Sequence, residues 1–213
     1  MKLVFATANP GKLREAAEIL GPGFTLLSSA QAGVTEDIPE TGETLRENSL
    51  QKARCLRERT GLDCFADDTG LEVDLLDGAP GVHTARYGGP GRDFQANMDR
   101  LLSELEPLQG PRTARFRTVV ALLLGKEEYL FEGVMEGEIA LHKAGLGGFG
   151  YDPVFIPSFL PVREAGHGTE TALVPNTLRL TAAEISEDAK NLISHRGRAL
   201  RAMASFLHSI RRI

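Results

Sequence analysis

The chain has 213 residues, which suits one domain with a substantial hydrophobic core. Its 24 basic and 29 acidic residues give a formal charge of −5, which excludes the broad basic surface that bulk DNA or RNA binding requires. The two cysteines, Cys55 and Cys64, are too few for a disulfide framework, so we expect a reducing cytoplasm. The N-terminal apolar stretch is too short for a signal peptide, and the sequence predicts no membrane span.

The first third of the chain alternates strand-like and helix-like patterns. Short apolar runs predict strands, and apolar residues spaced three and four apart predict helices. The expected elements are a strand at 3–8, a helix that begins after Asn9-Pro10-Gly11 and ends at Gly21, a strand at 24–28, a loop at 30–43, a helix from Leu45 that Gly61 ends, and a short strand at 64–66.

The rest of the chain adds an antiparallel part, which makes the expected sheet mixed. Thr181 and Glu184 have the spacing of a capping box for the first C-terminal helix, and Ser194 could cap the second. The segment 157–180 fits neither period, and we interpret it as an insertion or mobile flap. The expected elements are a loop at 77–93, a helix at 94–105, a hairpin of 116–124 and 129–134 around Gly125-Lys126, and two C-terminal helices.

A phosphate-binding turn is predicted at the first strand-to-helix junction. Thr7-Ala8-Asn9-Pro10-Gly11-Lys12 places a glycine and a lysine where a helix begins. The helix N-terminus and the lysine both favour an anion, although the Walker A pattern is absent. An ordinary turn with an exposed lysine is the alternative.

Acidic residues at two places suggest a metal site. Glu40 precedes a helix and lies beside a glycine, so helix capping accounts for it less well than for Glu43 and Glu47. Asp67 and Asp68 follow an apolar run, and adjacent side chains of an extended chain point to opposite faces. We therefore expect one of the two to face a site while the other supports a turn. An Asp-rich turn without a metal is the alternative.

Two further stretches could recognise a heterocycle or an anion. Gly145 to Pro153 surrounds Phe149 with glycines and continues with Tyr151 and Asp152, which suits stacking on a base, unless these aromatic rings fill the core. Lys190 and Ser194-His195-Arg196 offer donors near a helix terminus. A catalytic Ser–His pair is disfavoured, because sequence neighbours seldom have triad geometry. The remaining histidines have no metal-ligand spacing and are expected at the surface or in loops: His83, His142, His167 and His208.

The order of these motifs closely resembles that of the inosine triphosphate pyrophosphatase family, also called XTP/dITP diphosphatases. The resemblance covers the chain from residue 2 to about 210, and the glycine-rich and A-D-D-[ST]-G-L motifs are the most specific. The motifs are T-x-N-x-x-K at 7–12, E-T-G at 40–42, A-D-D-T-G-L at 66–71, A-P-G-V at 79–82, A-R-Y at 85–87, G-G-F-G-Y-D-P at 147–153 and S-H-R at 194–196.

The resemblance implies an α/β fold in which an elongated mixed sheet with flanking helices forms two lobes around a central nucleotide cleft. It implies a single bilobed domain over residues 1–213 and a homodimer, with no nucleic-acid or membrane partner. The implied activity is Mg²⁺-dependent hydrolysis of ITP, dITP and XTP to the monophosphate and pyrophosphate. Mn²⁺ would also suit the oxygen ligands. The link between the Tyr-Asp-Pro and Ser-His-Arg motifs, at 157–180, is longer than the family pattern.

Residue roles follow from the same resemblance. Glu40 and Asp68 would hold Mg²⁺, and Asp68 would also be the general base that activates water. Arg86 is a weaker candidate contact. Residues implied to bind substrate are Thr7, Ala8, Asn9, Pro10, Gly11, Lys12, Thr69, Phe149, Gly150, Tyr151, Asp152, Lys190, His195 and Arg196. The last three would contact the purine or the phosphates and favour a 6-keto group.

Three alternatives remain at this point. A haloacid-dehalogenase-type phosphatase also places acids at a strand end, but it requires D-x-D, whereas these acids are adjacent. A related pyrophosphatase could act on pyrimidine or modified nucleotides. A binding module without catalysis would leave the nucleotide intact.

Overall fold

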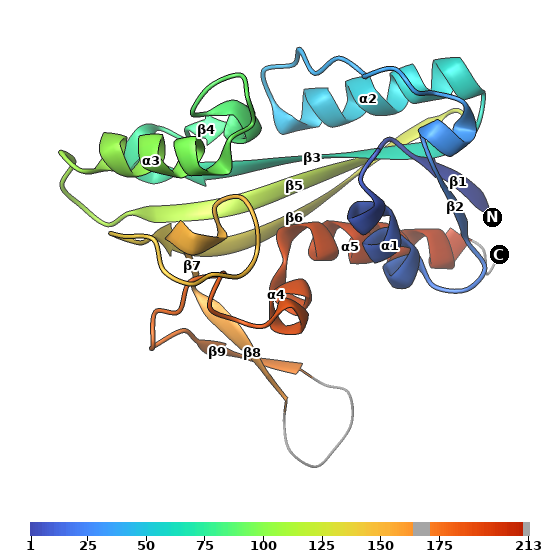
Figure 1. The fold of residues 1–213 in the computed structure, drawn as a ribbon. Coiled ribbons are helices and arrows are strands. Elements are labelled where there is room, and N and C mark those ends of the chain that lie inside the picture. Colours follow the sequence, from blue (N-terminus) through green and yellow to red (C-terminus); the bar gives the residue numbers. More distant parts are fainter. Residues whose placement is uncertain (164–170, 211–213) are drawn as a thin grey trace. The chain divides into compact units, whose positions relative to one another are not determined.

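The computed structural model describes residues 1–163 and 171–210 and shows an α/β fold with a mixed sheet (Figure 1). The described strands of the main sheet lie in the order β2-β1-β3-β5-β6-β7, with β4 beside β3, and β8 pairs with β9 separately. Strand β1 is parallel to β2 and β3, whereas β3–β4 and β6–β7 are antiparallel, which confirms the predicted mixed sheet. None of the described helices is both long and apolar enough to cross a bilayer.

The elements have the following bounds in chain order, with η for 3₁₀ turns: β1 Lys2–Phe5, α1 Pro10–Leu20, β2 Thr25–Ser28, η1 Ala30–Ala32, α2 Leu45–Thr60, β3 Cys64–Val73, η2 Asp74–Leu76, β4 Pro80–Gly81, η3 Thr84–Arg86, α3 Phe94–Leu105, β5 Thr113–Leu124, β6 Glu127–Ile139, η4 Asp152–Val154, β7 Phe155–Pro157, β8 Phe159–Arg163, β9 Thr171–Pro175, α4 Glu187–Ile193 and α5 His195–Ile210.

The chain forms two compact units. In the described chain, the first unit comprises residues 1–69, 118–133 and 195–210. The second unit comprises residues 70–117 and 134–194, of which 164–170 are not described. Strands β3, β5 and β6 each contribute residues to both units.

The first unit is a sheet with helices on both faces. Leu3 and Phe5 of β1 and Phe65 of β3 pack with α1 and α5. Val4 and Cys64, which alternate with them along the strands, pack with α2. Figure 1 shows α1 and α5 side by side, and the two helices are in contact. Strand alternation therefore assigns each strand residue to one of two helical layers.

Local capping explains why the first two helices begin and end close to where the sequence predicts. Helix α1 starts at Pro10, and the Asn9 side chain accepts hydrogen bonds from the first free backbone amides. Helix α2 starts with a capping box between Thr44 and Glu47 and ends at Gly61 in the left-handed conformation.

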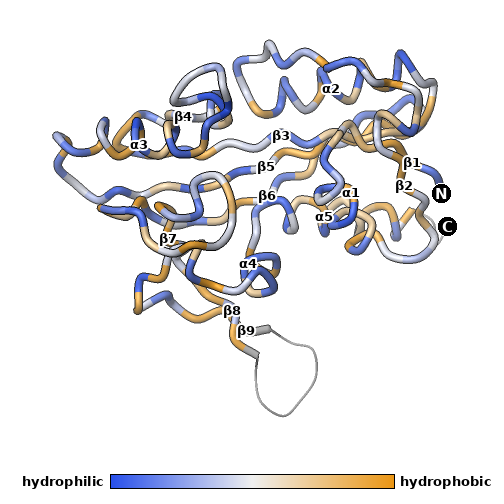
Figure 2. The backbone as a smooth tube through the Cα atoms, viewed as in Figure 1, coloured by the Kyte–Doolittle hydropathy of each residue, from blue (hydrophilic) through white to orange (hydrophobic). Residues whose placement is uncertain are grey.

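The core of the second unit lies between α3 and the strands. Met98 and Leu101 of α3 belong to a cluster with Phe116 and Phe155, whose rings meet edge to face at 4.8 Å. Strands β8 and β9 form an antiparallel pair, and Figure 2 shows hydrophobic colouring along β8. Phe159 of β8 is 48% exposed. The predicted irregular segment 157–180 thus contains two strands, apart from residues 164–170 outside the description.

Two further local predictions were wrong. Strand β3 does not stop at residue 66 but continues to Val73, so Asp67 and Asp68 lie within a strand and not at its end. Thr181 and Glu184 do hydrogen bond, with Thr181 N–H donating to Glu184 at 2.9 Å, yet they form only a turn. Helix α4 begins later, behind the Ser186 cap.

Gly133 on β6 permits a very close approach of α5. A Cβ at this position would lie 2.1 Å from the backbone oxygen of His195 and 2.5 Å from the backbone nitrogen of Ala199. Gly133→Ala should therefore destabilise the protein by at least about 1–3 kcal/mol, because backbone atoms would have to move. Urea denaturation would measure this loss. Gly91→Ala is the matched control, since its Cβ would meet no atom within 4 Å; equal losses in both variants would contradict the steric explanation.

Candidate functional site

The adjacent carboxylates Asp67 and Asp68 lie on opposite faces of β3. Asp67 shares its face with Phe65, toward α1 and α5, and Asp68 shares the other face with Ala66, toward α2. This separation agrees with the prediction that the two cannot together chelate one ion in an extended chain. Each carboxylate has its own cationic partners.

Asp67 is almost fully buried between two cations. Lys12 Nζ lies 3.0 and 2.9 Å from its two oxygens, and Arg196 Nε donates to Oδ2 at 3.0 Å. Burial alone would raise the pKa of Asp67, but the charges of Lys12, Arg196 and Lys52 outweigh it and hold the pKa well below its usual range. The expectation that Asp67 supports a turn was wrong, because it is a buried counter-ion within a strand.

The first turns of α1 and α5 supply these two cations. The Gly11 and Lys12 amides already donate to the Asn9 side chain, at 2.8 and 3.3 Å, and Pro10 has no amide proton. The backbone amides that were predicted to contact phosphate thus donate to the helix cap in this structure. Lys12 is partly exposed, and its ammonium faces the Asp67 carboxylate. Arg196 also pairs with Glu15, at 3.6 Å.

On the other face, Lys52 of α2 lies between Asp68 and Glu40. Its ammonium is 3.1 Å from Asp68 Oδ1 and 2.5 Å from Glu40 Oε1, and Lys52 is only 8% exposed. The structure therefore brings the two predicted metal ligands to one cation. Sequence reasoning missed Lys52, although its position seven residues after Leu45 and four before Leu56 places it on the core-facing side of the helix.

The charges around Lys52 perturb both members of the pair. Burial lowers the pKa of Lys52, but Asp68, Asp67 and Glu40 raise it more, so the ammonium form is favoured. Burial raises the pKa of Asp68, the Lys52 charge lowers it, and Glu40 raises it again; the net direction is upward. Asp68 is therefore a carboxylate with increased proton affinity, unlike its neighbour.

A chain of hydroxyl groups supports His195. The Thr69 and Thr118 hydroxyls lie 2.7 Å apart, and Thr118 Oγ1 is 2.6 Å from His195 Nδ1. Thr118 is fully buried on β5 and was not among the sequence candidates. The contact fixes the orientation of the imidazole ring of His195.

The chemistry of these side chains fits a hard cation such as Mg²⁺. Among residues 1–163 and 171–210, no three His, Cys, Asp or Glu side chains gather into a site able to hold a metal alone. Mg²⁺ commonly uses only one or two carboxylates and takes its remaining ligands from water and phosphates. Glu40 and Asp68 match that requirement. His167 lies outside the described residues, and His83 and His142 are exposed as predicted.

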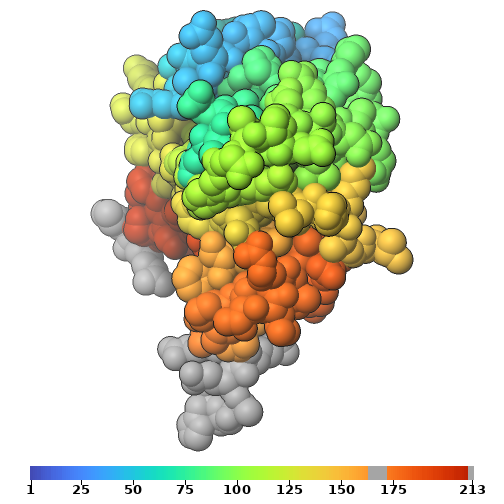
Figure 3. Space-filling view, turned by 90° about the vertical axis from the view of Figure 1, so that its left-hand side faces the viewer, coloured from blue at the N-terminus to red at the C-terminus, as the bar shows by residue number. Residues whose placement is uncertain are grey.

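The second unit contains the glycine-rich loop. Phe149 is 63% exposed, Lys190 Nζ lies 4.3 Å from its ring centroid, and Lys190 also pairs with Asp152. Asp152 accepts a hydrogen bond from the Phe149 amide at 2.7 Å, and Gly148 leaves no room for a Cβ beside the carboxylate. Figure 3 shows this gold-coloured loop at the surface.

Tyr151 and Arg86 occupy different environments. Tyr151 is 4% exposed within the core, and its hydroxyl donates to the Thr84 carbonyl at 2.9 Å. Burial raises the pKa of this phenol above its usual range. Arg86 is exposed in the same short turn as Thr84. The Phe149 ring is thus available for stacking, whereas Tyr151 anchors the loop.

Asp67→Asn should lower the free energy of unfolding at pH 7 by about 3–5 kcal/mol, because two cations lose a buried partner. The folded pKa of Asp67 lies below its unfolded value of about 3.9, so the stabilisation is present above that value and is lost as the pH falls below it. The difference between wild type and variant should therefore shrink below about pH 4. Denaturant titration from pH 7 to pH 3 would measure it.

Asp74→Asn is the control for this variant. Asp74 also pairs with an arginine, at 2.8 Å from Arg115 Nη2, but it is substantially exposed. Its loss should cost about 1 kcal/mol or less. Similar losses in both variants, or a difference that does not depend on pH, would contradict the role given to Asp67.

Comparisons with known proteins agree over nearly the full length. The chain matches the model of the Ham1 family over residues 3–206. A dITP/XTP pyrophosphatase of Porphyromonas gingivalis is 47% identical over 206 residues, covering 97% of each chain. One of Bacillus subtilis (strain 168) is 42% identical over 209 residues, covering 97% of this chain and 96% of its own.

Solved structures support the same relationship. The Ham1 protein of Staphylococcus aureus has a TM-score of 0.84 at 31% identity, over 99% of this chain and 100% of that chain. A HAM1 protein from Coxiella burnetii has a TM-score of 0.85 at 34% identity, over 98% and 99%. The family resemblance and the fold class predicted from the motifs are thereby confirmed, and the chain belongs to the Ham1 family.

Proposed function

We propose that this chain hydrolyses the deaminated purine nucleotides dITP, XTP and ITP to the monophosphate and pyrophosphate. Relatives at 41–47% identity carry the name dITP/XTP pyrophosphatase. The observation that carries the proposal is the charged arrangement around β3, where the carboxylates Asp67 and Asp68 and three cations come from four separate elements. Such an arrangement suits a polyanionic substrate more than a structural core. Removal of these nucleotides would keep them out of DNA and RNA.

The charge balance of this network supports a requirement for a divalent cation. Its three cations, Lys12, Lys52 and Arg196, face four carboxylates: Asp67, Asp68, Glu40 and Glu15. A triphosphate adds three to four negative charges, so the protein cations alone leave the complex strongly negative. When bound at Glu40 and Asp68, Mg²⁺ would neutralise phosphate charge as the α–β bond breaks, and Mn²⁺ would fit the same oxygens.

Asp68 is the proposed general base. Its raised pKa makes it a better proton acceptor than Asp67, whose carboxylate is held ionised by Lys12 and Arg196. Lys52 donates to Asp68 and would keep this oxygen oriented while the other activates water. Lys12 and Arg196 share one counter-ion, and we assign both to the phosphate groups.

Phe149 and its neighbours are the proposed base-recognition residues. A purine would stack on the exposed Phe149 ring, and the Lys190 ammonium can donate to a 6-keto oxygen but not to the 6-amino group of adenine. Such a mismatch leaves a donor unpaired, which disfavours ATP. His195, with one ring nitrogen held by Thr118, is a further proposed substrate contact.

A product assay tests the reaction directly. After light scattering has been used to check for the expected homodimer, the protein is incubated with XTP, dITP, ATP and GTP, with Mg²⁺ or with EDTA. We expect pyrophosphate and monophosphate from XTP and dITP with Mg²⁺, and rates at least about 100-fold lower with EDTA, because the substrate charge then stays unneutralised. Orthophosphate release would indicate a phosphatase, and intact nucleotide would indicate a binding module.

The Asp68→Asn variant tests the general base. We expect kcat for dITP to fall by about 10²–10⁴-fold while nucleotide binding persists, because the amide cannot accept the proton. Asp63→Asn is the control: Asp63 pairs with Arg57 at 2.9 Å in the same unit, but it touches none of the proposed site residues in the described contacts. Steady-state kinetics and equilibrium binding would separate the two effects; a kcat like that of wild type in Asp68→Asn would exclude the assignment.

A further inference from the structure

The segment before α2 is held to that helix at four consecutive backbone amides. Each N–H from residue 41 to residue 44 donates to a side chain of α2, so the segment follows the helix surface. The bonds are Thr41 N to Gln51 Oε1 at 3.0 Å, Gly42 N to Asn48 Oδ1 at 2.8 Å, Glu43 N to Glu47 Oε2 at 2.8 Å and Thr44 N to Glu47 Oε2 at 3.1 Å.

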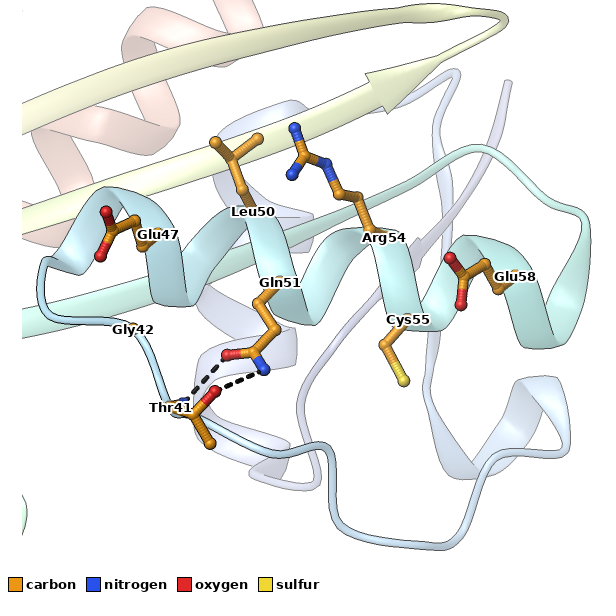
Figure 4. A pocket seen from close by; sticks show the side chains of 8 residues that line it. All are labelled: Thr41, Gly42, Glu47, Leu50, Gln51, Arg54, Cys55 and Glu58. Atoms are coloured by element: carbon orange, nitrogen blue, oxygen red, sulfur yellow. Dashed lines mark hydrogen bonds between the residues drawn. The ribbon is translucent and has the colours of Figure 1, made fainter.

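Helix capping accounts for only half of these bonds. Glu47 forms the capping box with Thr44, so its two contacts belong to the start of the helix. Gln51 and Asn48 lie further along α2 and hold residues that precede the cap. Gln51 makes a second bond, from Nε2 to Thr41 Oγ1 at 2.9 Å, and Figure 4 shows its side chain reaching from the helix to Thr41.

Asn48 connects the held segment to Asp68. Its amide oxygen accepts from Gly42 at 2.8 Å, and its side chain is among the groups that lower the pKa of Asp68 against the effect of burial. Asn48 is 4% exposed, and a Cβ on Gly42 would lie 3.0 Å from its Oδ1 and 2.6 Å from the Glu47 Cβ. The close fit leaves the backbone at Gly42 little freedom to shift against α2.

These contacts fix the position of Glu40. Glu40 immediately precedes Thr41, and its carboxylate meets Lys52, which follows Gln51 on α2. One helix therefore holds the backbone beside Glu40, supplies the counter-ion of its carboxylate and contacts Asp68. Outer hydrogen-bond partners of this kind orient ligands and commonly change metal affinity by 10–100-fold when they are removed.

We propose that Gln51 and Asn48 are positioning residues that set the Glu40 carboxylate relative to Asp68 and so determine the affinity for the divalent cation. The inference rests on the proposed function, which assigns Glu40 and Asp68 to the cation. Neither Gln51 nor Asn48 touches the substrate in this scheme.

Gln51 is the better position for a test. It lines an open pocket of about 470 Å³ on the outer side of α2, together with Thr41, Leu50 and Cys55 (Figure 4). A replacement there meets solvent and not a packed core, so the fold should persist. Asn48, by contrast, is buried, and its loss would leave polar groups without partners.

The experiment compares Gln51→Met with Glu47→Ala in the full chain. Gln51→Met removes both bonds to Thr41 while keeping side-chain length, whereas Glu47→Ala removes the cap bonds of the same segment. Binding of Mn²⁺ to each protein is titrated by electron paramagnetic resonance in the absence of nucleotide. Hydrogen exchange of the Thr41 and Gly42 amides is followed by NMR. The Mg²⁺ concentration that gives half-maximal dITP hydrolysis is measured separately. Thermal unfolding verifies that both variants fold.

Gln51→Met should raise the Mn²⁺ dissociation constant and the half-maximal Mg²⁺ concentration about tenfold or more, with faster exchange at Thr41 and little change in kcat at saturating Mg²⁺. Glu47→Ala should lower the melting temperature and leave cation affinity within about twofold. Three outcomes would overturn the proposal. Gln51→Met could bind the cation as tightly as wild type, Glu47→Ala could weaken cation binding as much as Gln51→Met does, or the wild-type protein could bind no Mn²⁺. Wild-type protein that binds Mn²⁺ but leaves every nucleotide intact would overturn the proposed function alone.

Discussion

The arrangement of the candidate site depends on one geometric constraint, the alternation of side chains along β3. Two adjacent carboxylates in an extended strand point to opposite faces, so each requires its own compensating charges in its own helical layer. Asp67 receives Lys12 and Arg196 from α1 and α5, and Asp68 receives Lys52 from α2. The helices that cover the two faces therefore also carry the cations that the strand requires.

The same alternation gives the two acids different chemistry. Asp67 has two close cations and a lowered pKa, so it behaves as a permanent anion that holds Lys12 and Arg196 in place. Asp68 shares a single ammonium with Glu40, and its pKa is raised. A pair of identical residues thus divides into a structural anion and a proton acceptor through environment alone.

Sequence reasoning succeeded where structure is determined locally. The turn at Asn9-Pro10-Gly11, the glycine at 61 and the apolar spacing of 94–105 placed three helices nearly as observed, because these signals act over a few residues. It failed at Asp67-Asp68, where turn-forming residue types continue a strand because distant cations compensate their charge. It failed again at Thr181, where the capping bonds formed without a helix to follow them.

The candidate site shows the same division between local and tertiary information. The motifs pointed to Lys12, Glu40, Asp68 and Arg196, but no pattern showed that Asp67 would be the buried counter-ion of Lys12 and Arg196 or that Lys52 would join Glu40 and Asp68. Lys52 occupies a core-facing position of an amphipathic helix, where a charge has no local explanation. The sequence signal for Lys52 was its charge on the apolar side of a helix. Only the fold reveals which carboxylates pair with this lysine.

The contact of Gly133 with the first turn of α5 also bears on how substitutions combine. Thr69, Thr118 and His195 begin or end segments of the first unit and are linked through their side chains, while Gly133, which ends the segment that Thr118 begins, lies against the His195 backbone. Residues from three stretches of sequence therefore meet in one cluster within that unit. Substitutions in such a cluster are coupled and not additive. The residue tolerated at any one of these four positions depends on the residues at the other three positions. Substitutions at the four positions are therefore expected to occur together.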